Sequence, residues 1–276
     1  MFEILKEVTI DSIKIVPLLF ITYLIIEFYE HNQSETNRVK LISWRKFGPI
    51  FGALIGCIPQ CGFSIVAASL YARKTISAGT LLAVFISTSD EAFPILLSNP
   101  SQINTIVKVI GLKILIGVVV GYLVDLVFHE ASDNMIESSL EPCGCNQGNV
   151  GHIKSALFHT LRIFCFIFLV NLGISILVES IGINQLKNIL LNGSILQPFA
   201  SAFIGLIPNC VASVMIAQLY LIDAIPFAVL VSGLISSAGM GLLMLFKMNK
   251  NRYENIAILI ILYLVAGISG VILLSF

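Results

Sequence analysis

The stretch Ile58-Pro59-Gln60-Cys61-Gly62-Phe63-Ser64 has a near-copy at Ile207-Pro208-Asn209-Cys210-Val211-Ala212-Ser213. Each carries a proline, a side-chain amide, a cysteine and a serine in the same order, inside a long apolar run. Proline removes a backbone N–H donor and disfavours helix at the residue before it, so we predict a helix break at Pro59 and at Pro208. A broken helix at membrane depth is tolerated where it is buried in protein or lines a cavity. The pair therefore points to a binding site.

The composition is that of a membrane protein. Hydrophobic residues make up 57% of the chain and charged residues 12%, and the mean hydropathy is +0.95. Soluble domains carry about 25% charged residues. Several stretches exceed the ~18 apolar residues that mark a membrane span. We predict an all-α polytopic membrane protein whose surroundings are the lipid bilayer, and the zero net charge gives no indication of a nucleic-acid partner.

The apolar runs fall into two sets of four on either side of a polar linker. The predicted spans lie at about residues 13–28, 47–71, 76–97 and 106–128, and then at about 156–178, 196–220, 225–246 and 256–274. We divide the chain into a first membrane repeat (1–128), a cytoplasmic acidic linker (129–155) and a second membrane repeat (156–276). The linker contains Cys143-Gly144-Cys145, whose spacing is not the two-residue gap of zinc sites.

The two halves match at a fixed offset. Pro59 and Pro208 are 149 positions apart (208 − 59). The same offset pairs Gln60 with Asn209, Cys61 with Cys210, Ser64 with Ser213, and Ser87-Thr88 with Ser236-Ser237. We therefore expect two homologous halves. Asp90-Glu91 aligns with Gly239-Met240, so the acidic pair belongs to one half only.

Corresponding loops differ in positive charge. Residues 30–46 hold four Lys or Arg and residues 184–193 hold only Lys187, whereas residues 99–104 hold none and their counterpart holds Lys247, Lys250 and Arg252. Cytoplasmic loops collect Lys and Arg, so the halves are predicted to be inverted repeats, the usual plan of secondary transporters.

Inversion needs an odd number of crossings in each half. We therefore predict that residues 47–71 form a re-entrant helical hairpin with Gln60-Cys61-Gly62 at its tip, leaving about three full spans per half. Arms of roughly 11 residues are about 16 Å long and reach the middle of the bilayer. Eight full spans in a parallel repeat are the alternative.

Asp90 and Glu91 are the first candidates for chemistry. A carboxylate at mid-span costs at least ~2.5–3.5 kcal/mol, so it normally faces a cavity, a partner or an ion path. The pair follows Ser87-Thr88-Ser89 and precedes Pro94, a third predicted break, so local carbonyls become available as ligands. The alternative is a structural pair with Lys108 or Lys113, which we disfavour because we place no basic residue at mid-span.

Amide and thiol groups at the two breaks come next. Gln60, Cys61, Asn209 and Cys210 would meet near the centre of an inverted pair, with Ser64 and Ser213 one turn away. The alternative is helix–helix hydrogen bonding together with small buried cysteines. Repetition of amide, cysteine and serine together favours a binding role.

At these motifs the sequence resembles the ten-helix heavy-metal exporter family, whose members are labelled arsenic efflux proteins or manganese transporters. The likeness is carried by residues 52–64, by residues 87–98 and by Ile207-Pro208-Asn209-Cys210. Six crossings and two hairpins of two arms give ten helical segments (6 + 4), in agreement with the family. The resemblance implies metal export from the cell across the plasma (inner) membrane.

Ligand chemistry helps to choose the substrate. Manganese favours carboxylate, amide and carbonyl oxygens, and arsenite favours several thiolates. The predicted metal ligands are Asp90, Glu91, Gln60, Asn209, Cys61 and Cys210. They favour a divalent transition metal, with arsenite efflux as the alternative. We expect no cofactor, a proton as candidate coupling ion and a homodimer as candidate assembly.

Two other classes of function fit less well. An intramembrane phosphatase would need a lysine or arginine near these motifs, and a hydrolase would need a histidine base; we expect neither, and so no enzyme. An organic-anion permease is opposed by Asp90-Glu91.

Overall fold

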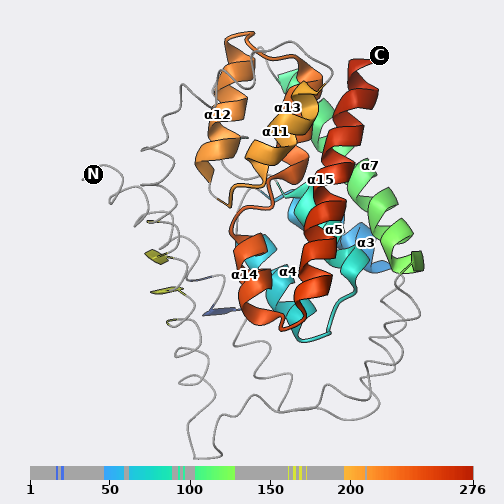
Figure 1. Ribbon diagram of the computed structural model, residues 1–276, viewed down its shortest axis with the longest axis vertical. Coiled ribbons are helices and arrows are strands. Elements are labelled where there is room, and N and C mark those ends of the chain that lie inside the picture. The colour runs from blue at the N-terminus through green and yellow to red at the C-terminus, as the bar shows by residue number, and fades with distance from the viewer. Residues whose placement is uncertain are drawn as a thin grey trace, which may run out of the picture.

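The computed structural model describes residues 47–58, 62–88, 103–127, 196–208 and 210–275, with a few isolated positions elsewhere. Every element within these ranges is a helix (Figure 1). In chain order they are α3 (Gly48–Gly56), α4 (Gly62–Ala72), α5 (Ala78–Ser87), α7 (Ile103–Val127), α11 (Gln197–Gly205), α12 (Cys210–Leu221), α13 (Phe227–Ser236), α14 (Met240–Met248) and α15 (Arg252–Leu274). The linker and almost all of the predicted spans at 13–28 and 156–178 lie outside these residues.

Both helix breaks predicted from proline are present. α3 ends at Gly56 and α4 begins at Gly62, on either side of Pro59. α11 ends at Gly205 and α12 begins at Cys210, and Pro208 lies between them. The missing N–H of proline and its steric effect on the preceding residue account for both interruptions.

Two further breaks interrupt the predicted spans at 76–97 and 225–246. A break at Pro94 was predicted in the first span, and none was predicted in the second. α5 ends at Ser87, ahead of Pro94. In the second half, Ser237–Gly239 separates α13 from α14, and Gly239 has φ 56°, a left-handed conformation that a right-handed helix cannot contain. Taken together, α13 and α14 still form an apolar stretch long enough to cross a membrane, as do α7 and α15.

The helix boundaries repeat at the offset seen in the sequence. α11 and α13 have the bounds of α3 and α5 shifted by 149 positions (197 − 48 and 227 − 78), and α15 begins 149 positions after α7 (252 − 103). α3, α5 and α7 pack as one group, and α11, α13 and α15 pack as another. In Figure 1 α7 descends while α15 ascends, so these two corresponding helices run in opposite directions.

Glycine allows α3 to lie directly against α5. A Cβ on Gly56 would lie 2.1 Å from Ser87 Oγ, and one on Gly48 would lie 2.2 Å from Thr80 Oγ1. Because the start of α3 is beside the start of α5 and the end beside the end, the two helices are parallel. In the second half a Cβ on Gly205 would likewise lie 2.2 Å from Ser236 Oγ.

Asp125 anchors the start of α5 to α7. Its Oδ1 accepts a hydrogen bond from Gly79 N at 2.8 Å, and its Oδ2 accepts one from Ser77 Oγ at 2.8 Å. Ser77 in turn caps the helix by accepting from Thr80 N. A carboxylate at a helix N-terminus is favourable because it meets unpaired N–H donors and the positive end of the dipole. Asp125 therefore has a structural role at the start of α5.

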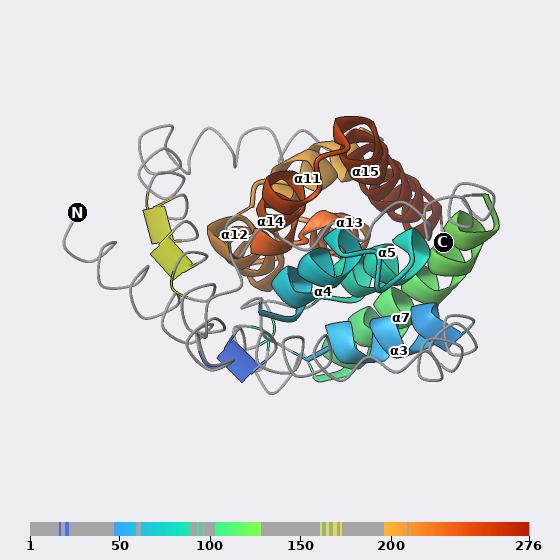
Figure 2. The same cartoon turned by 90° about the horizontal axis from the view of Figure 1, so that it is seen from below.

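The two halves interlock through α4 and α14. These two helices pack against each other although they come from different halves (Figure 2). Their N-terminal turns are in close contact, because a Cβ on Gly241 would lie 2.6 Å from Ser64 Cβ. α3 and α4, although consecutive, contact each other little. α4 is therefore packed more against α14 of the other half than against α3, its neighbour in the chain.

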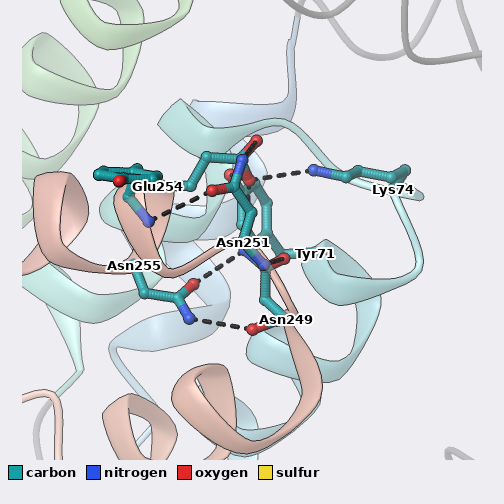
Figure 3. A network of polar contacts seen from close by, with 7 residues as sticks. Tyr71, Lys74, Asn249, Asn251, Glu254 and Asn255 are labelled. Atoms are coloured by element: carbon teal, nitrogen blue, oxygen red, sulfur yellow. Dashed lines mark hydrogen bonds and ion pairs between the residues drawn. The ribbon is translucent and has the colours of Figure 1, made fainter.

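A polar network joins the α4–α5 loop to the start of α15 (Figure 3). Glu254 Oε2 accepts hydrogen bonds from Tyr71 Oη at 3.1 Å, Lys74 Nζ at 3.1 Å and Asn249 Nδ2 at 3.2 Å. Asn255 is fully buried and exchanges two hydrogen bonds with Asn249. The loop carrying Arg73 and Lys74 is thus tied to the loop carrying Lys250.

The equivalent place at the other end of the helices is held differently. Shifting Tyr71 by 149 positions gives Tyr220, and shifting Glu254 back gives Thr105. Tyr220 Oη and Thr105 Oγ1 do lie together, at 3.4 Å. The pairing between halves is therefore repeated, but a carboxylate with four donors at one end corresponds to a hydroxyl pair at the other.

Candidate functional site

The candidate site residues that the structure describes lie at the ends of broken helices. Ser64 and Ser213 are in the first turns of α4 and α12. Ser87 and Thr88 end α5, and Ser236 and Ser237 end α13 in the same way. None of the six side chains is more than 3% exposed. Breaks that the sequence places far apart thus present hydroxyl groups to the interior of the protein.

The other candidates fall outside the described residues. They are Pro59, Gln60, Cys61, Ser89, Asp90, Glu91, Pro94 and Asn209. Cys210 is the first residue of α12, and its side chain is not described. Within the part of the chain that is described, no three His, Cys, Asp or Glu side chains come together. The ligand set Asp90, Glu91, Gln60, Asn209, Cys61 and Cys210 therefore stays a prediction.

Three of the buried hydroxyls donate to their own helices. Ser87 Oγ donates to the Ala83 carbonyl at 2.8 Å, and Thr88 Oγ1 donates to the Val84 carbonyl at 2.7 Å. Ser236 Oγ donates to the Gly233 carbonyl at 3.0 Å. Such bonds satisfy the hydroxyl proton, and in Thr88 and Ser236 they leave oxygen lone pairs able to accept a hydrogen bond or bind a cation.

Ser237 differs from its counterpart Thr88 (237 − 88 = 149). Its side chain is 3% exposed. Among the residues that the structure describes, its Oγ has no hydrogen-bond partner. A buried hydroxyl without a partner costs about 1–3 kcal/mol, so such groups usually serve a ligand or water. At the end of α13, this oxygen is available to a ligand.

Lys113 is a site residue that the sequence analysis considered only as a structural partner of Asp90-Glu91 and disfavoured. It is residue 11 of the 25 in α7 (113 − 103 + 1), and it is 1% exposed. Its Nζ donates to the carbonyl of Thr88, which ends α5, and to the carbonyl of Leu234 in the last turn of α13, at 2.8 Å. The expectation of no basic residue at mid-span was therefore wrong, and so was the expectation of none near these motifs. The signal was present, because Lys113 lay inside the predicted span at 106–128.

The helix ends explain why an ammonium group is stable there. The last carbonyls of a helix lack N–H partners, and the C-terminal end of the helix dipole is negative. Ala238 N bonds the Ser236 carbonyl, so the Leu234 carbonyl is available to Lys113. The ammonium thus lies between the C-terminal ends of a helix from each half, beside the segment that continues into Ser89-Asp90-Glu91.

A comparison with protein families gives a match. A family model described as "Putative, 10TM heavy-metal exporter" matches residues 3–184, which is 182 of the 276 residues (184 − 3 + 1). The chain belongs to this ten-helix heavy-metal exporter family. The match includes both first-half motifs and α3 to α7. No curated protein and no solved structure matches the chain.

Membership gives the buried polar centre a context. The exporter is a multi-span membrane protein, and a polar group deep in such a protein is expensive unless it serves an ion path or a paired site. In this family member Lys113 and the Thr88 and Leu234 carbonyls lie where α5 and α13 end, and Gly241 at the start of α14 lies against Ser64 of α4 and Phe85 of α5. Half-helix ends at membrane depth are the usual elements of substrate and ion sites in secondary transporters.

Proposed function

We propose that the protein is a secondary-active exporter of a divalent transition-metal cation, with Mn²⁺ as the substrate, in the plasma (inner) membrane. The observation that carries the proposal is the meeting of the C-terminal ends of α5 and α13 at Lys113, directly before Asp90-Glu91 in the chain. Helix-end carbonyls and carboxylates are oxygen ligands, which suit manganese. A proton is the proposed coupling ion.

We further propose that the halves are inverted repeats and that each contains a re-entrant hairpin. α3 runs parallel to α5, so the N-terminal end of α3 lies beside the start of α5. The C-terminal end of α4 is connected by a short loop to the same start of α5. The beginning of α3 and the end of α4 therefore lie at the same end of α5. The equal bounds of α11 and α13 support the same plan in the second half. The opposite directions of α7 and α15 support inversion.

Arsenite export is the second candidate, because soft arsenic(III) is bound by thiolates. Cys57 caps the C-terminal end of α3 and is half-buried. Its neighbour Gly56 packs against Ser87 at the C-terminal end of α5, which supports a position of Cys57 close to that helix end. With Cys61 and Cys210 it would supply three thiol groups.

Part of the argument against an enzyme has changed. Lys113 does lie near the Ser87–Glu91 motif, contrary to the sequence-based expectation. Its ammonium faces backbone carbonyls, however, and a group that neutralises phosphate would have to face the substrate oxygens instead. Membership in an exporter family also favours transport.

Metal content in cells tests the proposal. The full chain is expressed in a host that lacks its own manganese and arsenic efflux, and both elements are measured by elemental analysis. We expect the wild-type chain to lower cellular manganese, and Asp90→Asn to abolish this effect at an unchanged protein level. Cys61→Ala is expected to abolish it too if the thiol is a ligand.

Asp223→Asn is the matched control, because Asp223 is an exposed acid in the loop after α12. It should export as the wild type does. If the wild type lowers arsenic alone, arsenite is the substrate. If it lowers neither element, the export hypothesis is wrong.

A further inference from the structure

We propose that Lys113 is a tethered cation of the transport site, which supplies positive charge to the site when the metal has left. This inference deepens the proposed function and rests on it. Its ammonium lies in an oxygen-lined position made by both halves, the carbonyls of Thr88 and Leu234. Carbonyl oxygens at helix ends are also what a transported cation would use.

The burial of Lys113 at the depth of the membrane costs free energy, which indicates that the charge has a function. Lys113 is about 15 Å from the start of α7 at 1.5 Å per residue, which is the middle of a ~30 Å hydrocarbon layer. A lysine at that depth costs about 2.5–3.5 kcal/mol or more. Two carbonyl acceptors and two helix dipoles offset that cost, but an apolar residue would not incur it.

The other half shows that packing alone does not need the charge. The position 149 residues after Lys113 is Leu262, which is fully buried in α15. α15 packs against α13 as α7 packs against α5. A leucine therefore fills the equivalent place. The lysine, like the Asp90-Glu91 pair, occurs in the first half only.

The charges give the lysine its role. In the proposed site, the carboxylates of Asp90 and Glu91 and the ammonium of Lys113 carry one net negative charge without metal, which one coupling proton neutralises, and a divalent cation converts this to one net positive charge. Without the lysine, the metal-bound site would be neutral, whereas the metal-free site would carry two negative charges, of which one coupling proton would neutralise only one. An exporter without Lys113 should therefore still move with metal bound, but the return of the empty site across the membrane should become costly.

Exchange and net flux separate these two steps. The purified full chain is reconstituted in liposomes, and radioactive Mn²⁺ is followed with Mn²⁺ on both sides (exchange) or on one side only (net flux). For Lys113→Met we expect net flux to fall by at least about tenfold, while exchange stays within about threefold of wild type. Lys113→Gln keeps a hydrogen-bond donor without the charge and should behave in the same way.

Two variants act as controls. Lys113→Arg retains the charge and should keep net flux well above that of Lys113→Met. Lys108→Met removes an exposed lysine from the same helix and should change neither flux. Equal loss of exchange and net flux in both neutral variants would show a ligand or structural role and overturn the inference, as would unchanged net flux. If wild-type liposomes show no Mn²⁺ exchange at all, the proposed function itself is wrong and the inference falls with it.

Discussion

At the scale of single residues, Thr88 and Ser237 occupy equivalent positions at the ends of α5 and α13, but their hydroxyl groups have different surroundings. Thr88 Oγ1 is bonded within its own helix. Ser237 Oγ is buried and, in the part of the chain that the structure describes, lacks a hydrogen-bond partner. A side chain that stabilises nothing in the folded protein is a good candidate for a ligand to the substrate, and this can be tested by removing one oxygen atom.

Ser237→Ala should leave stability unchanged and weaken transport. No hydrogen bond within the protein is lost, so thermal unfolding in detergent should not shift downward. If the oxygen binds the metal, the KM of net Mn²⁺ flux should rise about fivefold, the equivalent of ~1 kcal/mol.

Ser69→Ala is its matched control. Ser69 is also buried, but its Oγ donates to the Ile65 carbonyl within α4. This variant should leave KM unchanged. A lower unfolding temperature for Ser237→Ala, with an unchanged KM, would mean that its hydroxyl is structural.

At the scale of elements, the helices α4 and α12 end in tyrosines that tie the two halves together with unequal strength. Tyr71 donates a hydrogen bond to the carboxylate of Glu254, which also accepts hydrogen bonds from Lys74 and Asn249. Its counterpart Tyr220 meets only the hydroxyl of Thr105 in this pairing, at 3.4 Å. Hydrogen bonds to charged groups are worth more than those between neutral groups.

Tyr71→Phe should therefore cost more stability than Tyr220→Phe. We expect a loss of about 1–2 kcal/mol for Tyr71→Phe and under about 0.5 kcal/mol for Tyr220→Phe. Both variants keep the aromatic ring, so the ring contacts with Lys74 and Phe227 remain. Thermal unfolding of the purified proteins under identical conditions measures the difference, and equal shifts would show that the carboxylate network adds nothing.

At the scale of the whole molecule, the network of Figure 3 brings two basic loops together. Arg73 and Lys74 follow α4, and Lys250 lies just before α15; the two loops are joined by the Lys74–Glu254 ion pair at 3.1 Å. The loop after α12, residues 222–226, has no Lys or Arg. Because cytoplasmic loops collect Lys and Arg, we predict that the two basic loops lie on the cytoplasmic side and residues 222–226 on the opposite side.

Thiol labelling tests that orientation. Thr75→Cys, Lys250→Cys and Asp223→Cys each replace an exposed loop residue, in a background without the native cysteines. A reagent that cannot cross membranes should label Asp223→Cys in intact cells and the other two only after permeabilisation. Labelling of all three from the same side would favour a parallel repeat over the inverted one.

The membrane class, the family, the two-fold repeat and the breaks at Pro59 and Pro208 were predictable from the sequence. Hydropathy and proline act locally, so neighbouring residues are sufficient to predict them. The hydroxyl-rich ends of α5 and α13 were also found, because polar residues in an apolar run are conspicuous. The break before Gly239 was missed, because a glycine in an apolar run does not by itself reveal its φ.

Only the tertiary structure decided which ends meet. The contact of α4 with α14 joins residues from different halves, and no sequence spacing encodes it. Lys113 was visible in the sequence, but its role depends on two carbonyls, those of Thr88 and Leu234, which are 25 and 121 positions away. Backbone carbonyls are the same at every residue, so only the places where helices end and pack together determine which of them can hold a charge.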